Sequence, residues 1–187
     1  MTDFELLLGK AKAFHGDLCA GIVLGTRMTM IGMRELGMNP MERNKNLIVY
    51  VEIDRCIADA IQAITGCSLG HRTLKYRPYG KFAATYINLK TGEAVRVSVV
   101  EKKRTEKTGQ EAMKDAARIL LEAPEAELFR LKKVRVAIPD GDMPGMPKYH
   151  ARCSRCNEMI VDNKEVTIDG TVFCGNCAHG SYYMDAE

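Results

Sequence analysis

The chain has 187 residues, enough for one substantial hydrophobic core and a small appended unit. Its 46% hydrophobic and 27% charged residues are ordinary for a globular protein, and a net charge of +3 is too small to indicate nucleic-acid binding by itself. No apolar run approaches the roughly 18–20 residues that a transmembrane helix needs. The N-terminal MTDFELLLGKAK is acidic where a secretory signal is basic, so we expect a cytoplasmic protein without a membrane span.

The N-terminal part of the chain predicts two helices separated by a short turn. Apolar residues at helical spacing predict an amphipathic helix over 3–14, which Gly16 can end. Asp17 is a good N-cap residue and is expected to begin a second helix, which runs to about Leu36.

The middle of the chain predicts strands and one further helix. The continuous apolar, β-branched run at 46–53 is typical of a strand that is buried on both faces. Asp54 is expected to cap a helix over 55–65. The stretch at 81–100 alternates around Lys90-Thr91-Gly92 and predicts a β-hairpin.

The remaining elements of this part are two helices and a strand. Helical patterns at 108–123 and 125–132 precede a predicted strand at 133–138. The next ten residues, PDGDMPGMPK, contain three prolines and two glycines, which is typical of a linker.

Cysteine usage indicates metal or thiol chemistry, because an odd total of seven without an export signal argues against a disulfide framework. Four thiolates in two C-x2-C pairs can close a tetrahedron around zinc, which would supply much of the folding energy of so short a segment. A redox role for either pair is the alternative, and His179 is expected to be a surface residue. The two pairs are separated by seventeen residues and consist of Cys153, Cys156, Cys174 and Cys177.

These patterns together predict an α+β protein with an appended ribbon. A hairpin is expected around Asp169-Gly170 inside the ribbon, and the balanced charges of the ribbon do not favour nucleic-acid binding. We expect a helix-rich core domain around an antiparallel or mixed β-sheet at 1–140, a linker at 141–149 and a small zinc ribbon at 150–187.

A second group of reactive side chains lies upstream. His15, Asp17 and Cys19 fall within five positions, and Cys56 opens the predicted helix that follows the buried strand. A thiol in the first turn of a helix has a lowered pKa, so these residues predict an N/S/O metal site with Asp17 as a fourth ligand. Asp59, one turn after Cys56, can hydrogen-bond a ligand. Buried structural cysteines, a helix-end histidine and a solvated aspartate are the alternative.

Other candidate residues surround these motifs. Gly21 and Gly25 lie four apart on one helix face, where another backbone can pack closely. Arg27 could clamp a carboxylate or phosphate of a bound cofactor, or form a surface salt bridge, and Cys67 is expected to be structural. A basic stretch could recognise a small anionic ligand, with Lys81 as its cofactor-binding candidate, or be an exposed loop: His71, Arg72, Lys75, Arg77 and Lys81.

Three motifs together resemble the E-subunit family of formylmethanofuran dehydrogenase: FHGDLCAGIVLGTR, CIADAIQAITGCSLGHRTLKYRPYGK and the C-terminal cysteine pairs. The resemblance runs from about residue 13 to residue 100, in the same order and spacing. It implies an α+β core, a metal in a cleft, a zinc ribbon and a homodimer, with His15, Cys19 and Cys56 in the metal-site pattern and Asp59 in the matching helix. Asp17 stands where the family usually has a second histidine, which favours a harder divalent ion such as iron beside zinc.

The resemblance implies an accessory or small-substrate metalloenzyme role in redox or one-carbon metabolism, with zinc in the ribbon and zinc or iron in the core. Nothing in the chain is large enough to carry molybdenum or tungsten cofactor chemistry. A non-catalytic adaptor that docks on oxidoreductase subunits is one alternative, and a metal-responsive regulator that uses the ribbon on nucleic acid is another. The sequence assigns no catalytic residue and no substrate.

Overall fold

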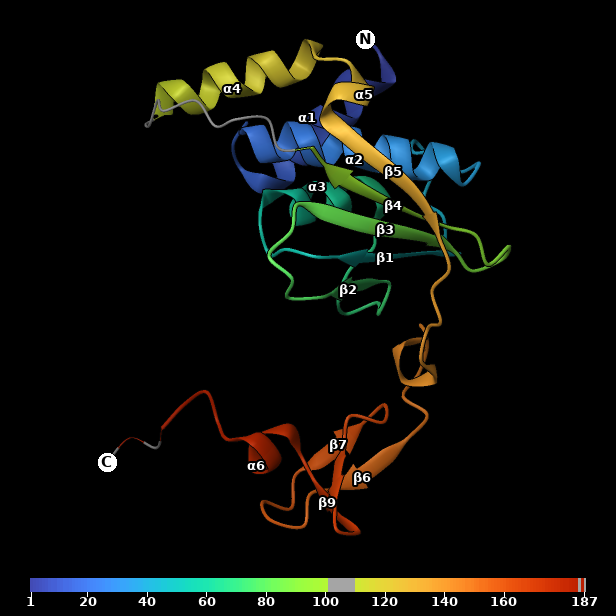
Figure 1. Ribbon diagram of the computed structural model, residues 1–187, viewed down its shortest axis with the longest axis vertical. Helices are drawn as coiled ribbons and strands as arrows, with labels where there is room; N and C mark the ends of the chain where they lie inside the picture. The colour runs from blue at the N-terminus through green and yellow to red at the C-terminus, as the bar shows by residue number, and fades with distance from the viewer. Residues whose placement is uncertain (101–109, 185, 187) are drawn as a thin grey trace. The chain divides into compact units, whose positions relative to one another are not determined.

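The computed structural model describes residues 1–100, 110–184 and 186 and divides into two compact units, Met1–Val136 and Ala137–Glu187 (Figure 1). The first unit combines helices with a mixed sheet, and the second is a small unit of short strands that carries four cysteines. The predicted α+β fold class is therefore confirmed. None of the described helices is long and apolar enough to span a bilayer.

The first unit is built on a five-stranded sheet of order β2-β1-β3-β4-β5. The β1–β2 pair is parallel and the other pairs are antiparallel, so the sheet is mixed. Every residue of β1 and β3 is buried, as expected for interior strands. The strands are β1 (Leu47–Val51), β2 (Leu74–Tyr76), β3 (Ala83–Asn88), β4 (Ala94–Val99) and β5 (Phe129–Val134).

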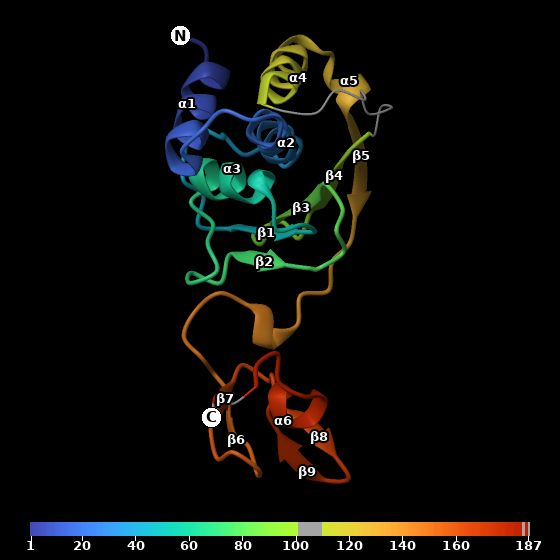
Figure 2. The same cartoon turned by 90° about the vertical axis from the view of Figure 1, so that its left-hand side faces the viewer.

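Helices cover one face of this sheet (Figure 2). The main apolar cluster joins Met28 and Ile31 of α2 and Ile57 of α3 to sheet residues such as Val49 and Val97. Burial of these side chains stabilises the layer by about 1.5–3 kcal/mol each. The helices are α1 (Asp3–His15), α2 (Ala20–Glu35), α3 (Cys56–Thr65), α4 (Gln110–Glu122) and the short α5 (Glu125–Leu128).

Glycines on α2 allow the closest contacts in this layer. A Cβ at Gly25 would lie 2.9 Å from the Ile57 Cα and 2.7 Å from the Ala60 Cβ, and a Cβ at Gly32 would collide with the Tyr86 ring. The predicted close packing at Gly21 and Gly25 is therefore confirmed. As a consequence, the N-terminal ends of α2 and α3 lie side by side.

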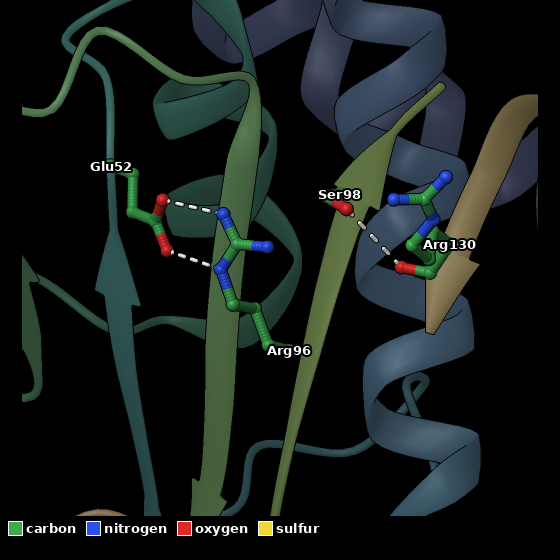
Figure 3. A network of polar contacts seen from close by, with 4 residues as sticks. All are labelled: Glu52, Arg96, Ser98 and Arg130. Carbon is green, nitrogen blue, oxygen red and sulfur yellow. Dashed lines mark hydrogen bonds and ion pairs between the residues drawn. The ribbon is translucent and has the colours of Figure 1, made fainter. Parts of the chain in front are cut away.

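A partly buried ion pair connects the end of β1 to β4 across β3 (Figure 3). The Arg96 guanidinium donates from Nε to Glu52 Oε1 at 2.6 Å and from Nη2 to Oε2 at 2.7 Å. The Glu52 side chain is only 9% exposed, and the hydrogen bond to this carboxylate raises the pKa of Arg96. The same view shows the Ser98 hydroxyl donating to the Arg130 carbonyl, which supports the β4–β5 pairing.

Two predicted helix caps are wrong. The N-cap of α2 is Cys19 and that of α3 is Arg55. Asp17 Oδ1 instead accepts the adjacent Leu18 N–H at 2.6 Å, and the Asp54 carboxylate interacts with the Tyr76 hydroxyl. Short carboxylates compete for nearby donors, and here those donors lie outside the first turn of the helix.

The predicted helix at 125–132 is also mostly wrong. Only Glu125–Leu128 is helical, and Phe129–Val134 forms β5, four residues earlier than the predicted strand at 133–138. Phe129 enters the core opposite Val99, and the backbone groups pair with β4, so tertiary pairing overrides the helical pattern. The sequence also missed β2. The first two residues of the predicted helix at 108–123 lie outside the described residues.

The second unit contains two small two-stranded sheets. The predicted hairpin at Asp169-Gly170 is present, with φ of 49° and 76° as a tight turn requires. The segment predicted as a linker begins this unit, where the Lys164 ammonium lies 2.9 Å from the buried Asp142 carboxylate. The elements are the 3-10 turn η1 (Asp140–Asp142), β6 (His150–Arg152), β7 (Met159–Val161), β8 (Val166–Ile168), β9 (Thr171–Phe173) and α6 (Gly175–His179).

Candidate metal centres

Three helix ends bring one imidazole and two thiols together in the first unit, and we call this group the core centre. His15 is the last residue of α1, Cys19 is the N-cap of α2 and Cys56 is the first residue of α3. One ligand atom from each lies within 4.8 Å of the other two, and His15 Nε2 is 3.8 Å from Cys19 Sγ. All three side chains are half-buried.

Backbone geometry explains this convergence. Gly16 adopts φ of 96°, a left-handed conformation that ends α1 and lets α2 start four residues later. Gly21 faces α3 so closely that a Cβ there would lie 2.8 Å from the Cys56 Cβ and 3.7 Å from the Cys19 Sγ. The absence of a side chain at Gly21 therefore sets how near the two thiols can come.

Asp59 orients the imidazole of the core centre. Its Oδ2 lies 2.7 Å from His15 Nδ1, one helical turn after Cys56 on α3. A carboxylate can only accept, so Nδ1 carries the proton and the lone pair of Nε2 faces the thiols. The predicted contact between Asp59 and a candidate ligand is thus present in the structure.

The electrostatics of the core centre differ from the sequence expectation. Burial and the neighbouring Cys19 thiol raise the pKa of Cys56, whereas its place at a helix N-terminus predicted a lowered value. Burial and the repulsion between two thiolates at this distance together exceed the effect of the helix dipole. A cation removes this repulsion, so the pair is better suited to metal binding than to two free thiolates.

The donor set fits a divalent metal ion. With Zn–S near 2.3 Å and Zn–N near 2.0–2.1 Å, ligand atoms in a tetrahedral site lie about 3.5–3.8 Å apart. The 3.8 Å between His15 Nε2 and Cys19 Sγ matches this spacing. A cation held by these three side chains would keep one coordination position free and would supply a Lewis acid there.

The four C-terminal cysteines form a second group, which we call the ribbon centre. Their Sγ atoms all lie within 4.8 Å of one another, and Cys156 Sγ is 3.8 Å from Cys174 Sγ. Backbone N–H groups of Cys156 and Cys174 lower the pKa of Cys153 to about 6, while burial and the neighbouring thiols raise that of Cys177 to about 12. Four sulfur ligands complete a tetrahedron, so this arrangement suits a closed structural zinc site.

The structure places several candidate residues away from both centres. Asp17 lies outside the core group, as His179 lies outside the ribbon group. The Arg27 guanidinium donates to the Leu120 carbonyl at 2.6 Å, which fixes the end of α4 rather than an anion. The Lys81 ammonium lies 6.0 Å from the centre of the Tyr79 ring.

Two further residues complete this description. The Cys67 thiol is buried and donates to the Leu47 carbonyl at 3.6 Å, as expected of a structural cysteine. Tyr76, which the sequence did not single out, ends β2 and interacts with Asp54 shortly before α3. Burial and the Asp54 carboxylate raise the pKa of Tyr76. This contact was missed because the sequence did not predict β2, the strand that carries Tyr76.

Comparison with known proteins agrees with this architecture. The chain is 32% identical over 205 aligned residues to a probable S-adenosyl-L-methionine-binding protein of Archaeoglobus fulgidus; the match covers 95% of this chain and 53% of that protein. The chain therefore spans about half the length of this relative. An FmdE-like protein of Syntrophus aciditrophicus, named after tungsten formylmethanofuran dehydrogenase, has a similar fold, with a TM-score of 0.62, 22% identity and coverage of 97% of this chain and 95% of that one.

A family model described as FmdE, molybdenum formylmethanofuran dehydrogenase operon, matches residues 14–130. This range contains all three residues of the core centre, together with Asp59, strands β1 to β4 and the first two residues of β5. The resemblance inferred from the sequence motifs is thereby confirmed. The chain belongs to the FmdE family.

Proposed function

We propose that this protein binds two metal ions, which have different roles, and that it acts in redox or one-carbon metabolism. The core centre binds a divalent cation that serves a small substrate, either directly or as an accessory to a larger oxidoreductase. The ribbon centre binds a structural zinc. The observation that carries the proposal is the convergence of one imidazole nitrogen and two thiol sulfurs within 4.8 Å at three helix ends.

The number and type of ligands support an open core site. Structural zinc sites are usually closed by four protein ligands, whereas catalytic sites keep three and leave a position for water or substrate. Two cysteines with one histidine is one of the known catalytic sets. This donor set suits zinc, and iron is the second candidate.

The protein residues have separable tasks in this proposal. The Cys19 and Cys56 thiols each give up a proton on binding the cation, and their two negative charges balance its charge. Asp59 keeps the proton of His15 on Nδ1 and so directs Nε2 to the cation. The three side chains are half-buried, so the centre is partly accessible to solvent.

The place in metabolism is drawn from the family. The matching family model refers to a molybdenum formylmethanofuran dehydrogenase operon, and the structurally similar protein is named after the tungsten enzyme. Both names concern one-carbon redox chemistry. The S-adenosyl-L-methionine in the name of the Archaeoglobus relative is not carried over, because about half of that protein lies outside the match.

Metal analysis tests the proposal. We expect the purified full-length protein to contain two metal ions per chain by inductively coupled plasma mass spectrometry. Cys19→Ser should lose the core metal alone and Cys156→Ser the ribbon metal alone. Cys67→Ser is the matched control, because this cysteine lies in the first unit but outside both groups, and it should keep both ions.

Cobalt substitution then tests the open position. A cobalt-loaded Cys156→Ser variant reports on the core centre alone, and cyanide should change its visible spectrum if a position is free. Full metal occupancy in Cys19→Ser would contradict the core centre. A core spectrum that does not respond to cyanide, azide or small thiols would contradict the open position and favour a purely structural metal.

A further inference from the structure

The two thiols of the core centre lie close enough to react with each other. Cys19 Sγ and Cys56 Sγ are within 4.8 Å, and both side chains are half-buried. A disulfide requires an S–S distance of about 2.0 Å, so the two sulfurs would have to approach each other by rotation about their χ1 angles. By contrast, the buried Cys67 thiol is committed to the Leu47 carbonyl.

Position 21 lies beside both sulfurs. A Cβ at Gly21 would lie 2.8 Å from the Cys56 Cβ, 3.4 Å from Cys56 Sγ and 3.7 Å from Cys19 Sγ, so a side chain there would crowd Cys56 and contact both sulfurs. Glycine leaves that space free. Cys19 lies in an extended N-cap conformation and Cys56 opens α3, so the thiols come from neighbouring helix ends whose separation is fixed by packing.

We propose that Cys19 and Cys56 form a reversible redox pair: in the metal-free protein, a hydroperoxide oxidises them to a disulfide, and a bound cation prevents this. The oxidation itself rests on the sulfur geometry alone, whereas the protection by metal rests on the proposed function. The oxidised core centre therefore cannot bind metal until a thiol reductant restores the two thiols.

The reaction balances with hydrogen peroxide as the oxidant. One sulfur attacks the peroxide, the O–O bond breaks, and a sulfenic acid and one water are formed. The second sulfur displaces the hydroxyl of the sulfenic acid, which forms the S–S bond and releases a second water. Both thiols lose their protons, two electrons pass to the peroxide, and two of the three metal ligands are consumed.

Peptide mapping tests the pair in the full chain. The protein is stripped with a chelator, exposed to hydrogen peroxide and digested with trypsin, which places Cys19 in peptide 13–27 and Cys56 in peptide 56–72. We expect a cross-link between these peptides that dithiothreitol reverses. Fragmentation distinguishes Cys56 from Cys67 in the wild type, and Cys67→Ser gives the same answer without that ambiguity.

Protection by metal is measured in parallel. Zinc at 100 times its dissociation constant should slow cross-linking about 100-fold, because only the free protein reacts. In Cys19→Ser the cross-link should disappear, and dimedone should trap Cys56 as a sulfenic acid. This variant still reports on the chemistry of Cys56 even though it binds no core metal.

The outcomes separate the two proposals. If metal-free protein oxidises to sulfinic acids without forming the cross-link, the redox pair is overturned and the metal site still stands. If the cross-link forms equally fast with and without zinc, the pair is supported, while protection by metal and the core metal site are both contradicted. A cross-link from Cys67 instead of Cys56 also overturns the pair.

Discussion

The two candidate centres show two different ways of bringing sulfur atoms together. In the core centre the ligands come from three helix ends, and Cys19 and Cys56 are far apart in the chain. Helices α2 and α3 pack on the sheet, and α1 packs on these two helices. In the ribbon centre all four cysteines lie between Cys153 and Cys177. Among the described residues of the second unit, the buried hydrophobic side chains are only Cys153 and Ile160.

The two centres differ in what holds their ligands in position. A hydrophobic layer positions the core ligands before any cation arrives, so metal binding there uses an existing arrangement. The second unit lacks enough apolar burial to position its thiols, so a bound cation would have to provide the folding free energy. The following changes should affect one unit and leave the other intact.

Removal of the ribbon metal should have the largest effect. We expect Cys156→Ser, or treatment with a strong chelator, to abolish amide hydrogen-exchange protection across the second unit, because structural zinc contributes about 10–16 kcal/mol of apparent binding free energy. Protection of β1 and β3 should be unchanged. A ribbon that stays protected without metal would remove the distinction between the two units.

A methyl group at Gly25 should have the next largest effect, confined to the core. Gly25→Ala brings a Cβ within 2.9 Å of the Ile57 Cα, so backbone must shift, at a cost of about 1–3 kcal/mol in urea unfolding. Gly9→Ala is the matched control, since nothing lies within 4 Å of a Cβ there, and it should stabilise α1 by up to about 1 kcal/mol. Ribbon zinc content should not change in either variant.

Loss of the Asp59 carboxylate should weaken only the core metal. Asp59→Asn keeps the size of the side chain but replaces the charged acceptor of the His15 Nδ1 proton with a neutral amide, so metal affinity should fall about 10–100-fold in a competition titration. Asp17→Asn is the control, because that carboxylate accepts from Leu18 and lies outside the cluster. Equal losses in the two variants would contradict the assigned role of Asp59.

The smallest expected effects are opposite responses of the two units to pH. Burial raises the pKa of Cys67, so the core loses stability as pH rises above the unfolded value near 9, by at most about 1.4 kcal/mol per pH unit. The pKa of Cys153 is lowered to about 6, so protonation of this thiolate should compete with the proposed ribbon metal as pH falls toward and below about 6. Cys67→Ser should reduce the alkaline slope of the core in urea titrations, and the raised pKa of Cys56 should leave part of it.

Sequence reasoning predicted the residues of both centres better than the elements around them. The two C-x2-C pairs are local signals, and the Gly21 and Gly25 spacing anticipated the close approach of another helix. Phe129 could not be assigned correctly, because its strand depends on pairing with β4, which is distant in the chain. Tertiary contacts decided that element, and the parallel pairing with β1 decided β2, which was not predicted from the sequence.

The helix caps near the core centre and the pKa of Cys56 could not be predicted from the local sequence either. Asp17 and Asp54 have ideal capping chemistry, yet each has another donor nearby in the fold. Cys56 has the place of a low-pKa thiol, but the raised value follows from burial beside Cys19, which belongs to another helix. Such effects depend on distances between segments that are far apart in the chain, and hydrophobic periodicity contains no information about those distances.

The bare backbone at Gly21 has a consequence for how this centre can be altered. Gly21 lies beside both sulfur donors but is not itself a ligand, so the size of this residue influences the distance between the two sulfurs. Alanine or serine at position 21 would increase the distance between the ligand atoms by small amounts. Selection or engineering could thereby change which ion fits while every ligand residue stays the same.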